Sequence, residues 1–151
     1  NDTTKPIISF YYWKTIFKLS EKEKETLLEN NVRKIYIRYF DIDLHPKDTS
    51  PIPLTPIRFM EKMDSFDIVP VVYIKNKVML KPNLDVEDLA QKTVKLINEI
   101  NSKNNINSKE IQVDCDWTLS SKDNYLKFIE LFKKLSQKKM AKAYHSLLKI
   151  T

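Results

Sequence analysis

The chain has 151 residues, enough for one domain with a hydrophobic core, and no apolar run approaches the roughly 20 residues that a membrane helix needs. The formal net charge is +6, but the lysines are scattered among acidic residues. They form no basic stripe interleaved with aromatic residues, so we expect no nucleic acid to bind. The single cysteine, Cys115, excludes an internal disulfide, and we expect neither a metal nor a cofactor. Glycine is absent, so turns must rely on Asn, Asp, Ser and Pro.

Strand-like and helix-like segments alternate along the chain. Runs rich in Ile, Val, Tyr and Phe predict strands near residues 7–13, 34–43, 67–74 and 110–118. Amphipathic or capped segments predict helices at 20–31, 55–65, 86–102 and 120–139. The helix at 20–31 should begin with a capping box. The helix at 55–65 should begin with Thr55 as its cap and Pro56 in its first turn. The Pro-rich segment 44–56 is predicted to be a loop at the functional end of the second strand.

This alternation predicts an α/β fold with parallel strands. A doubly wound fold that binds phosphate usually has a glycine-rich first turn, which this chain lacks. Polar side chains instead gather toward the carboxyl ends of the predicted strands, where barrels place their active sites. We therefore expect a (β/α)4 portion of a TIM-type barrel. The predicted ligand-binding residues are Trp13, Arg38, Asp41, Asp43, Tyr73, Gln112, Asp114 and Asp116.

The sequence IQVDCDWT in the fourth predicted strand carries the most specific signal. Because side chains alternate along a strand, Gln112, Asp114 and Asp116 should share one face, with Val113, Cys115 and Trp117 on the other. Buried carboxylates are costly unless they are paired or used. Asp114 and Asp116 are therefore candidates for ligand binding or catalysis. The alternative is a structural network in which both pair with Arg38.

The VDCDWT segment resembles the D-x-D-x-E signature on the fourth strand of family 18 chitinases and related glycoside-hydrolase-like barrels. The match covers Asp114, Asp116 and Trp117, but Thr118 occupies the position of the glutamate that protonates the glycosidic oxygen in those enzymes. A threonine hydroxyl cannot serve as a general acid near neutral pH. The chain is also similar, over residues 7 to about 138, to the front part of uncharacterised glycoside-hydrolase-like cell-envelope barrels with IYIR-F-D-x-D, VPVVYI and DCDWT segments. The resemblance implies a barrel and sugar-like ligands rather than the chitinase mechanism.

Other residues near the strand ends have two interpretations. Tyr11, Tyr12 and Trp13 are either a platform for stacking sugar rings or part of the core. Asp41 and Asp43 either line the site or cap the loop that follows. His45 is expected to be a solvated loop residue.

The end of the sequence is unusual for a barrel, which needs a turn and a fifth strand after the fourth helix. Residues 138–141, Lys-Lys-Met-Ala, can be encoded as AAA AAA ATG GCN. Restoring one A gives Lys-Lys-Asn-Gly, and the continued frame permits K-S-L-S-F-T-I-K, a turn followed by a strand pattern. We therefore predict a polar tether at 1–5, a half-barrel domain at 6–139 and an atypical tail at 140–151 that arises from a frameshift near Met140.

The sequence is compatible with three functions. The first is a fragment of a glycoside-hydrolase-like barrel whose parent binds or hydrolyses a polysaccharide, with little activity expected of this chain alone. The second is a non-catalytic carbohydrate-binding or scaffold protein. The third is a small basic protein that binds nucleic acid, for which binding should depend steeply on salt. We expect an exported or lipid-anchored cell-envelope location, and homodimerisation through the open sheet edges or else marginal stability.

Overall fold

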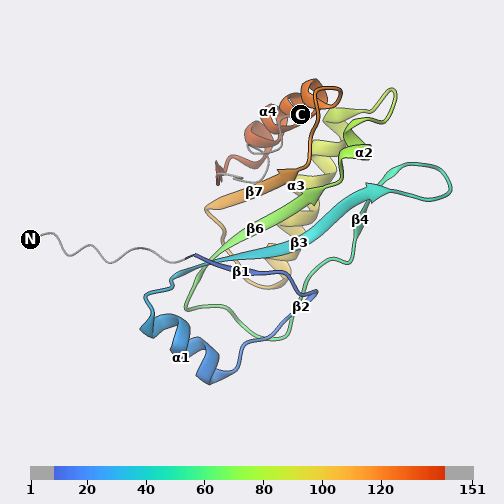
Figure 1. Cartoon of the computed structure of the whole chain (residues 1–151). Helices are drawn as coiled ribbons and strands as arrows, with labels where there is room; N and C mark the ends of the chain where they lie inside the picture. Colours follow the sequence, from blue (N-terminus) through green and yellow to red (C-terminus); the bar gives the residue numbers. More distant parts are fainter. Residues whose placement is uncertain (1–8, 142–151) are drawn as a thin grey trace, which may run out of the picture.

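A mostly parallel sheet backed by two long helices forms the α/β fold of the chain (Figure 1). The structure, a computed structural model, describes residues 9–141. The predicted tether at 1–5 and residues 142–151 of the predicted tail lie outside the described residues. None of the helices within residues 9–141 has an apolar stretch long enough to cross a membrane.

The main sheet follows the order of the chain. Its parallel strands lie side by side in the order β1 (Phe10–Tyr12), β3 (Lys34–Leu44), β6 (Asp67–Ile74), β7 (Glu110–Cys115) and β8 (Lys139–Met140). One strand, β4 (Pro51–Leu54), runs antiparallel to the carboxyl-terminal part of β3. A separate two-stranded parallel sheet pairs β2 (Ile16–Phe17) with β5 (Arg58–Phe59). The α/β class with mainly parallel strands is therefore confirmed.

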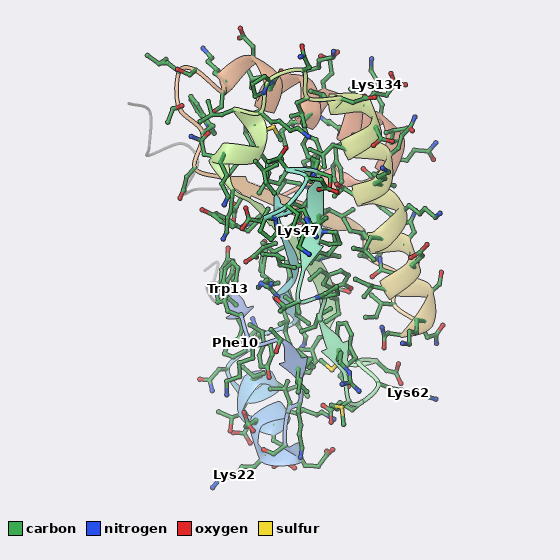
Figure 2. The ribbon with its side chains drawn as sticks, turned by 90° about the vertical axis from the view of Figure 1, so that its right-hand side faces the viewer. Phe10, Trp13, Lys22, Lys47, Lys62 and Lys134 are labelled. Atoms are coloured by element: carbon green, nitrogen blue, oxygen red, sulfur yellow. The ribbon has the colours of Figure 1, made fainter. Side chains whose placement is uncertain are left out.

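Two helices, α3 (Val86–Lys103) and α4 (Lys122–Ser136), cover one face of the sheet (Figures 1 and 2). Phe128 and Phe132 of α4 and Ile97 of α3 are fully buried in the core against that face. A buried hydrogen bond of 2.6 Å from the Tyr39 hydroxyl to Asn101 Oδ1 ties β3 to α3. The short α2 (Asn76–Met79) follows β6, and α1 (Glu21–Glu29) lies apart from α3 and α4 with no buried residue. The sheet is thus covered by helices mainly on one side.

Several predicted elements match the structure closely. β3 and β6 fall within one residue of their predicted bounds, and α1, α3 and α4 lie within their predicted segments to within one residue. The predicted capping box is confirmed, because the Glu23 N–H donates to Ser20 Oγ and the Ser20 N–H donates to Glu23 Oε1. β7 ends at Cys115 rather than at residue 118, and β1 is limited to Phe10–Tyr12 within the described chain.

The helix predicted at 55–65 is wrong, and the loop predicted at 44–56 contains β4. Thr55 has a left-handed φ of 42°, which a helix cap does not have. The Ile57 N–H donates to the Tyr39 carbonyl, and the Arg58 N–H donates to the Thr15 carbonyl. These amides therefore join strands rather than a helical turn, and the connection from β3 to β6 is built from β4, β5 and bends.

A β-bulge interrupts β3 between Arg38 and Phe40. Arg38 is opposite Val71 and Phe40 is opposite the next residue, Val72, so Tyr39 is the extra residue. An extra residue in a strand shifts by one position the alternation of side chains between the two faces of the sheet. Arg38 and Asp41, three residues apart, therefore lie on the same face, while Tyr39 and Phe40 are both buried.

Left-handed positions in this glycine-free chain are filled by other residues. Three of those described are asparagines, as expected for turns without glycine: Asn31, Asn83 and Asn105. The others are Thr49, Thr55 and Gln137, at which a left-handed backbone is less favourable. Gln137 ends α4 and leads into β8, where the Ala141 N–H donates to the Ile111 carbonyl. A turn and the first residues of a fifth parallel strand therefore precede the undescribed part of the predicted tail.

Candidate functional site

A hollow of about 370 Å³ lies at the carboxyl ends of β3, β6 and β7. We call it the strand-end hollow, and its lining residues are Trp13, Arg38, Asp41, Tyr73, Asp114, Cys115 and Asp116. Figure 2 shows Trp13 on the side of the sheet opposite α3. Six of the eight predicted ligand-binding residues therefore meet in one place, although they come from four separate segments of the chain.

Strand register sets the spacing of the polar side chains. Asp41, Tyr73 and Asp114 are opposite one another on β3, β6 and β7, so their side chains leave the same face in one row. Neighbouring strands are about 4.8 Å apart, which separates the backbones of Asp41 and Asp114 by roughly 10 Å. Asp116 lies beyond the end of β7, and the Tyr73 hydroxyl donates to its Oδ2 at 2.8 Å. Tyr73 thus links the middle of the hollow to its β7 side.

Arg38 forms the β3 side of the hollow. Its Nε donates to Asp41 Oδ1 at 2.9 Å, and its Nη1 donates to the Thr55 carbonyl at 3.0 Å. Its Nη2 donates to the Leu54 carbonyl and to Thr55 Oγ1. Within residues 9–141, the guanidinium therefore donates hydrogen bonds to Asp41 and to the residues at the end of β4. Arg38 thus forms an ion pair with Asp41, an acid that the network suggested by the sequence did not include.

Gln112 supports Asp114 from below the hollow and does not line it. Both side chains are buried, and Gln112 Nε2 donates to the two carboxylate oxygens of Asp114 at 3.3 and 3.1 Å. Gln112 Oε1 is buried without a hydrogen-bond partner among the described residues. Gln112 and Asp114 lie on the predicted common face, and Cys115 lies in the core on the other.

Burial and negative charge govern ionisation around the hollow. Burial raises the pKa of Tyr73 well above its ordinary value, and the hydrogen bond to Asp116 raises it further. Burial, followed by the charges of Asp116 and Asp114, raises the pKa of the Cys115 thiol to about 12. Tyr73 therefore remains a hydrogen-bond donor at neutral pH, and Cys115 remains a protonated thiol rather than a nucleophile.

Aromatic side chains continue the hollow toward β1. The ring of Trp13 is 49% exposed and stacks with that of Tyr11 at a centroid distance of 6.3 Å and an interplanar angle of 7°. Tyr11 stacks in turn on Tyr36 at 4.6 Å. Tyr12 points the other way and packs against Phe17 in the core. Of the three aromatic residues predicted as platform or core, Tyr11 and Trp13 are therefore accessible and Tyr12 is not.

Asp43 lies outside the hollow, at the end of β3. Its two oxygens form ion pairs of 2.9 Å with Lys75 and Lys77, and Oδ1 accepts the Leu44 N–H. The two lysines hold the pKa of Asp43 well below its usual range. Asp43 thus joins β3 to the start of α2. His45 is in the following turn, with Nδ1 at 3.5 Å from Asp48 Oδ1.

Thr118, at the position of the catalytic glutamate in the D-x-D-x-E pattern, lies past the end of β7 in the approach to α4. Its N–H donates to Ser121 Oγ, and its carbonyl accepts the Ser121 N–H. Trp117 stacks against Tyr125 of α4. Thr118 is not among the residues that line the hollow. No group of three or more His, Cys, Asp or Glu side chains within residues 9–141 is arranged to hold a metal ion.

Sequence reasoning missed two parts of the site. Thr55 accepts two hydrogen bonds from Arg38, whereas the sequence predicts that it caps a helix. Its left-handed backbone is incompatible with a cap, and the sequence has no signal for this conformation. Cys115 lines the hollow although its side chain belongs to the core. A second pocket of about 300 Å³, between α3 and the β3–β4 pair, contains none of the predicted site residues.

Comparison of the chain with protein-family models, curated proteins and solved structures gives no match.

Proposed function

We propose that the strand-end hollow binds sugar rings of a polysaccharide, and that the chain is a (β/α)4 portion of a glycoside-hydrolase-like barrel with a binding rather than a hydrolytic role. The observation that carries the proposal is the meeting of Trp13, Tyr73 and three carboxylates around one hollow. Aromatic faces suit the apolar faces of pyranose rings, and carboxylates accept hydrogen bonds from ring hydroxyls.

The strand order supports the barrel part of the proposal. Four consecutive parallel pairs lie in chain order, from β1 to β8. In a doubly wound sheet, the order of the strands reverses at a switch point, and the ligand binds there. The site here instead spans the carboxyl ends of neighbouring strands, as in barrels.

The chemistry of the hollow favours binding over hydrolysis. Thr118 cannot supply the proton that a leaving sugar needs, and it lies away from the hollow. Hydrolysis by Asp114 and Asp116 is the second candidate, because both carboxylates line the hollow. A phosphate backbone is a poor ligand for a surface with three carboxylates, so nucleic acid is disfavoured at this site.

Affinity electrophoresis of the full chain in gels containing a panel of soluble polysaccharides tests the proposal. We expect one polysaccharide class to retard the protein, and Trp13→Ala to weaken that binding about tenfold, which corresponds to about 1.4 kcal/mol. Met60→Ala and Asp64→Asn, at exposed positions outside the hollow, are the controls and should bind normally. Migration unchanged by every polysaccharide would contradict the proposal, as would full binding by Trp13→Ala.

The same preparation separates binding from hydrolysis. We expect no release of reducing ends from the bound polysaccharide over long incubation. Turnover that Asp116→Asn abolishes and Asp64→Asn preserves would establish the hydrolytic candidate instead.

A further inference from the structure

The pocket between α3 and the β3–β4 pair lies beside a connection that has no helix. Parallel strands are usually joined through a helix, but the connection from β3 to β6 contains only β4, β5 and bends. Phe40 and Ile42 of β3 therefore line an opening beside α3 instead of packing under a crossover helix. The volume of this α3 pocket is about 300 Å³, at the lower end of the range for small-molecule sites.

The walls of the α3 pocket are mainly apolar. They include Phe40, Ile42, Ile52, Leu84, Leu89 and Leu96. Thr93 also lines the pocket, but its buried hydroxyl donates to the Leu89 carbonyl at 2.7 Å. Among the described residues, no buried side-chain polar atom in these walls lacks a hydrogen-bond partner. The interior therefore suits a hydrocarbon, since a polar group placed there would lose its hydrogen bonds to water without replacement.

Four charged side chains stand at the rim of the α3 pocket, and three of them have partners. Lys92 Nζ forms an ion pair of 2.9 Å with Asp88 Oδ2. Asp85 is the N-cap of α3, where its Oδ1 accepts the Asp88 N–H and its charge meets the positive end of the helix dipole. Lys81 is half-buried, and its ammonium makes no ion pair or hydrogen bond within residues 9–141. One positive charge at the rim is thus left without a partner.

We propose that the α3 pocket binds a medium-chain fatty acid, with the hydrocarbon chain against the apolar walls and the carboxylate paired with Lys81. A cavity of roughly 150 Å³ holds one benzene molecule, so a pocket of about twice that volume suits a chain of about eight to ten carbons. A neutral head group would gain no ion pair with Lys81. This site is separate from the strand-end hollow, and the proposal does not depend on sugar binding.

Isothermal titration calorimetry of the full chain with a homologous series of ligands tests the proposal. The probes are butanoate, hexanoate, octanoate and decanoate, with octan-1-ol and octylamine as controls for the head group. Each added pair of methylenes up to octanoate should tighten binding about tenfold. Octanoate should bind about fivefold more tightly than octan-1-ol, because a partly exposed ion pair contributes modestly, and octylamine should bind more weakly than either. Methyl NMR signals of Leu89 and Leu96 should shift when octanoate is added.

Two variants, each with a matched control, locate the site. Lys81→Gln should reduce the affinity for octanoate about fivefold, to that for octan-1-ol, whereas Lys95→Gln, at an exposed position of α3 outside the pocket, should have no effect. Ile52→Asn places an amide in the half-buried β4 wall and should weaken octanoate binding about tenfold, whereas Leu126→Asn, at an exposed position of α4, should not. Thermal melting should show that all four variants are folded, and the ligand series on the unaltered chain needs no variant.

Four outcomes would overturn the proposal. The first is that none of the probes binds. The second is equal affinity for octanoate, octan-1-ol and octylamine, which would show an apolar pocket that does not select an anion. The third is octanoate binding that Lys81→Gln and Ile52→Asn both leave unchanged, which would place the ligand elsewhere. The fourth is a shift of the Leu89 and Leu96 methyl signals with protein concentration alone, which would show that a second copy of the chain occupies the pocket.

Discussion

Cys115 combines deep burial with two neighbouring carboxylates, and its thiol provides a test at the scale of one residue. Its pKa is raised to about 12 in the folded chain, whereas an unfolded cysteine ionises near 8.5. A raised folded-state pKa stabilises the fold fully below the unfolded pKa, and that contribution is lost as pH rises toward the folded value. The wild-type chain should therefore lose stability between about pH 9 and 12.

Urea unfolding at pH 8, 9.5 and 11 measures this loss against Cys115→Ala. The loss attributable to the thiol should be on the order of a few kcal/mol, since one pKa unit corresponds to about 1.4 kcal/mol. Cys115→Ala is less stable at pH 8 because it leaves a small cavity, but its stability should fall less with pH. Parallel curves for the two proteins, or rapid alkylation of the folded thiol at pH 9, would contradict this account.

The positions of most candidate side chains could be predicted from the sequence because alternation fixes which residues of a strand share a face. Asp114 and Gln112 follow directly from the pattern in IQVDCDWT, and so does the burial of Cys115 on the other face. Which cation pairs with which acid could not be predicted, because that choice depends on the register between strands. Arg38 pairs with Asp41 and with Thr55, a residue whose left-handed backbone has no signal in the sequence.

At the scale of elements, β3 contains a signal that strict alternation overlooks. Its apolar residues fall at Ile35, Ile37 and Tyr39, and then at Phe40 and Ile42, so the pattern shifts by one position. Such a shift indicates a bulge.

The helix predicted at 55–65 failed for another reason. Thr55 and Pro56 suit a helix start locally, but the backbone amides that follow donate hydrogen bonds to the carbonyls of Tyr39 and Thr15. Tertiary contacts outweighed local propensity there.

The end of α4 gives a prediction about element stability. Gln137 is in the left-handed region at φ 54°, which favours glycine. Gln137→Gly should raise the free energy of unfolding by about 0.5–1 kcal/mol. Lys127→Gly, at an exposed site in the interior of the same helix, should lower it by about 1 kcal/mol. Thermal and urea unfolding of the two variants would show opposite shifts, and a loss of stability in Gln137→Gly would contradict the assigned backbone.

At the scale of the whole molecule, the part of the sheet formed by the described residues has two outer edges. Within residues 9–141, β1 pairs on one side with β3, and β8 pairs on one side with β7. Unpaired strand edges are templates for association. We therefore propose that the 151-residue chain forms a homodimer through these edges. Light scattering during gel filtration should give about twice the mass of 17.9 kDa at high concentration, with dissociation on dilution. A single monomeric species throughout that range would contradict the proposal.

The bulge in β3 also determines which changes in chain length the sheet tolerates. An in-frame deletion of the codon for Tyr39 would leave Arg38, Phe40 and Asp41 in regular alternation, and each side chain would keep its face. The same deletion at Val72 in β6, which pairs without a bulge to β7, would turn Tyr73 away from Asp116 toward the helices. Loss of Tyr39 from β3 would therefore keep the faces of Arg38 and Asp41 but remove the buried hydrogen bond to Asn101 of α3. Loss of a residue from β6 would move Tyr73 out of the hollow altogether.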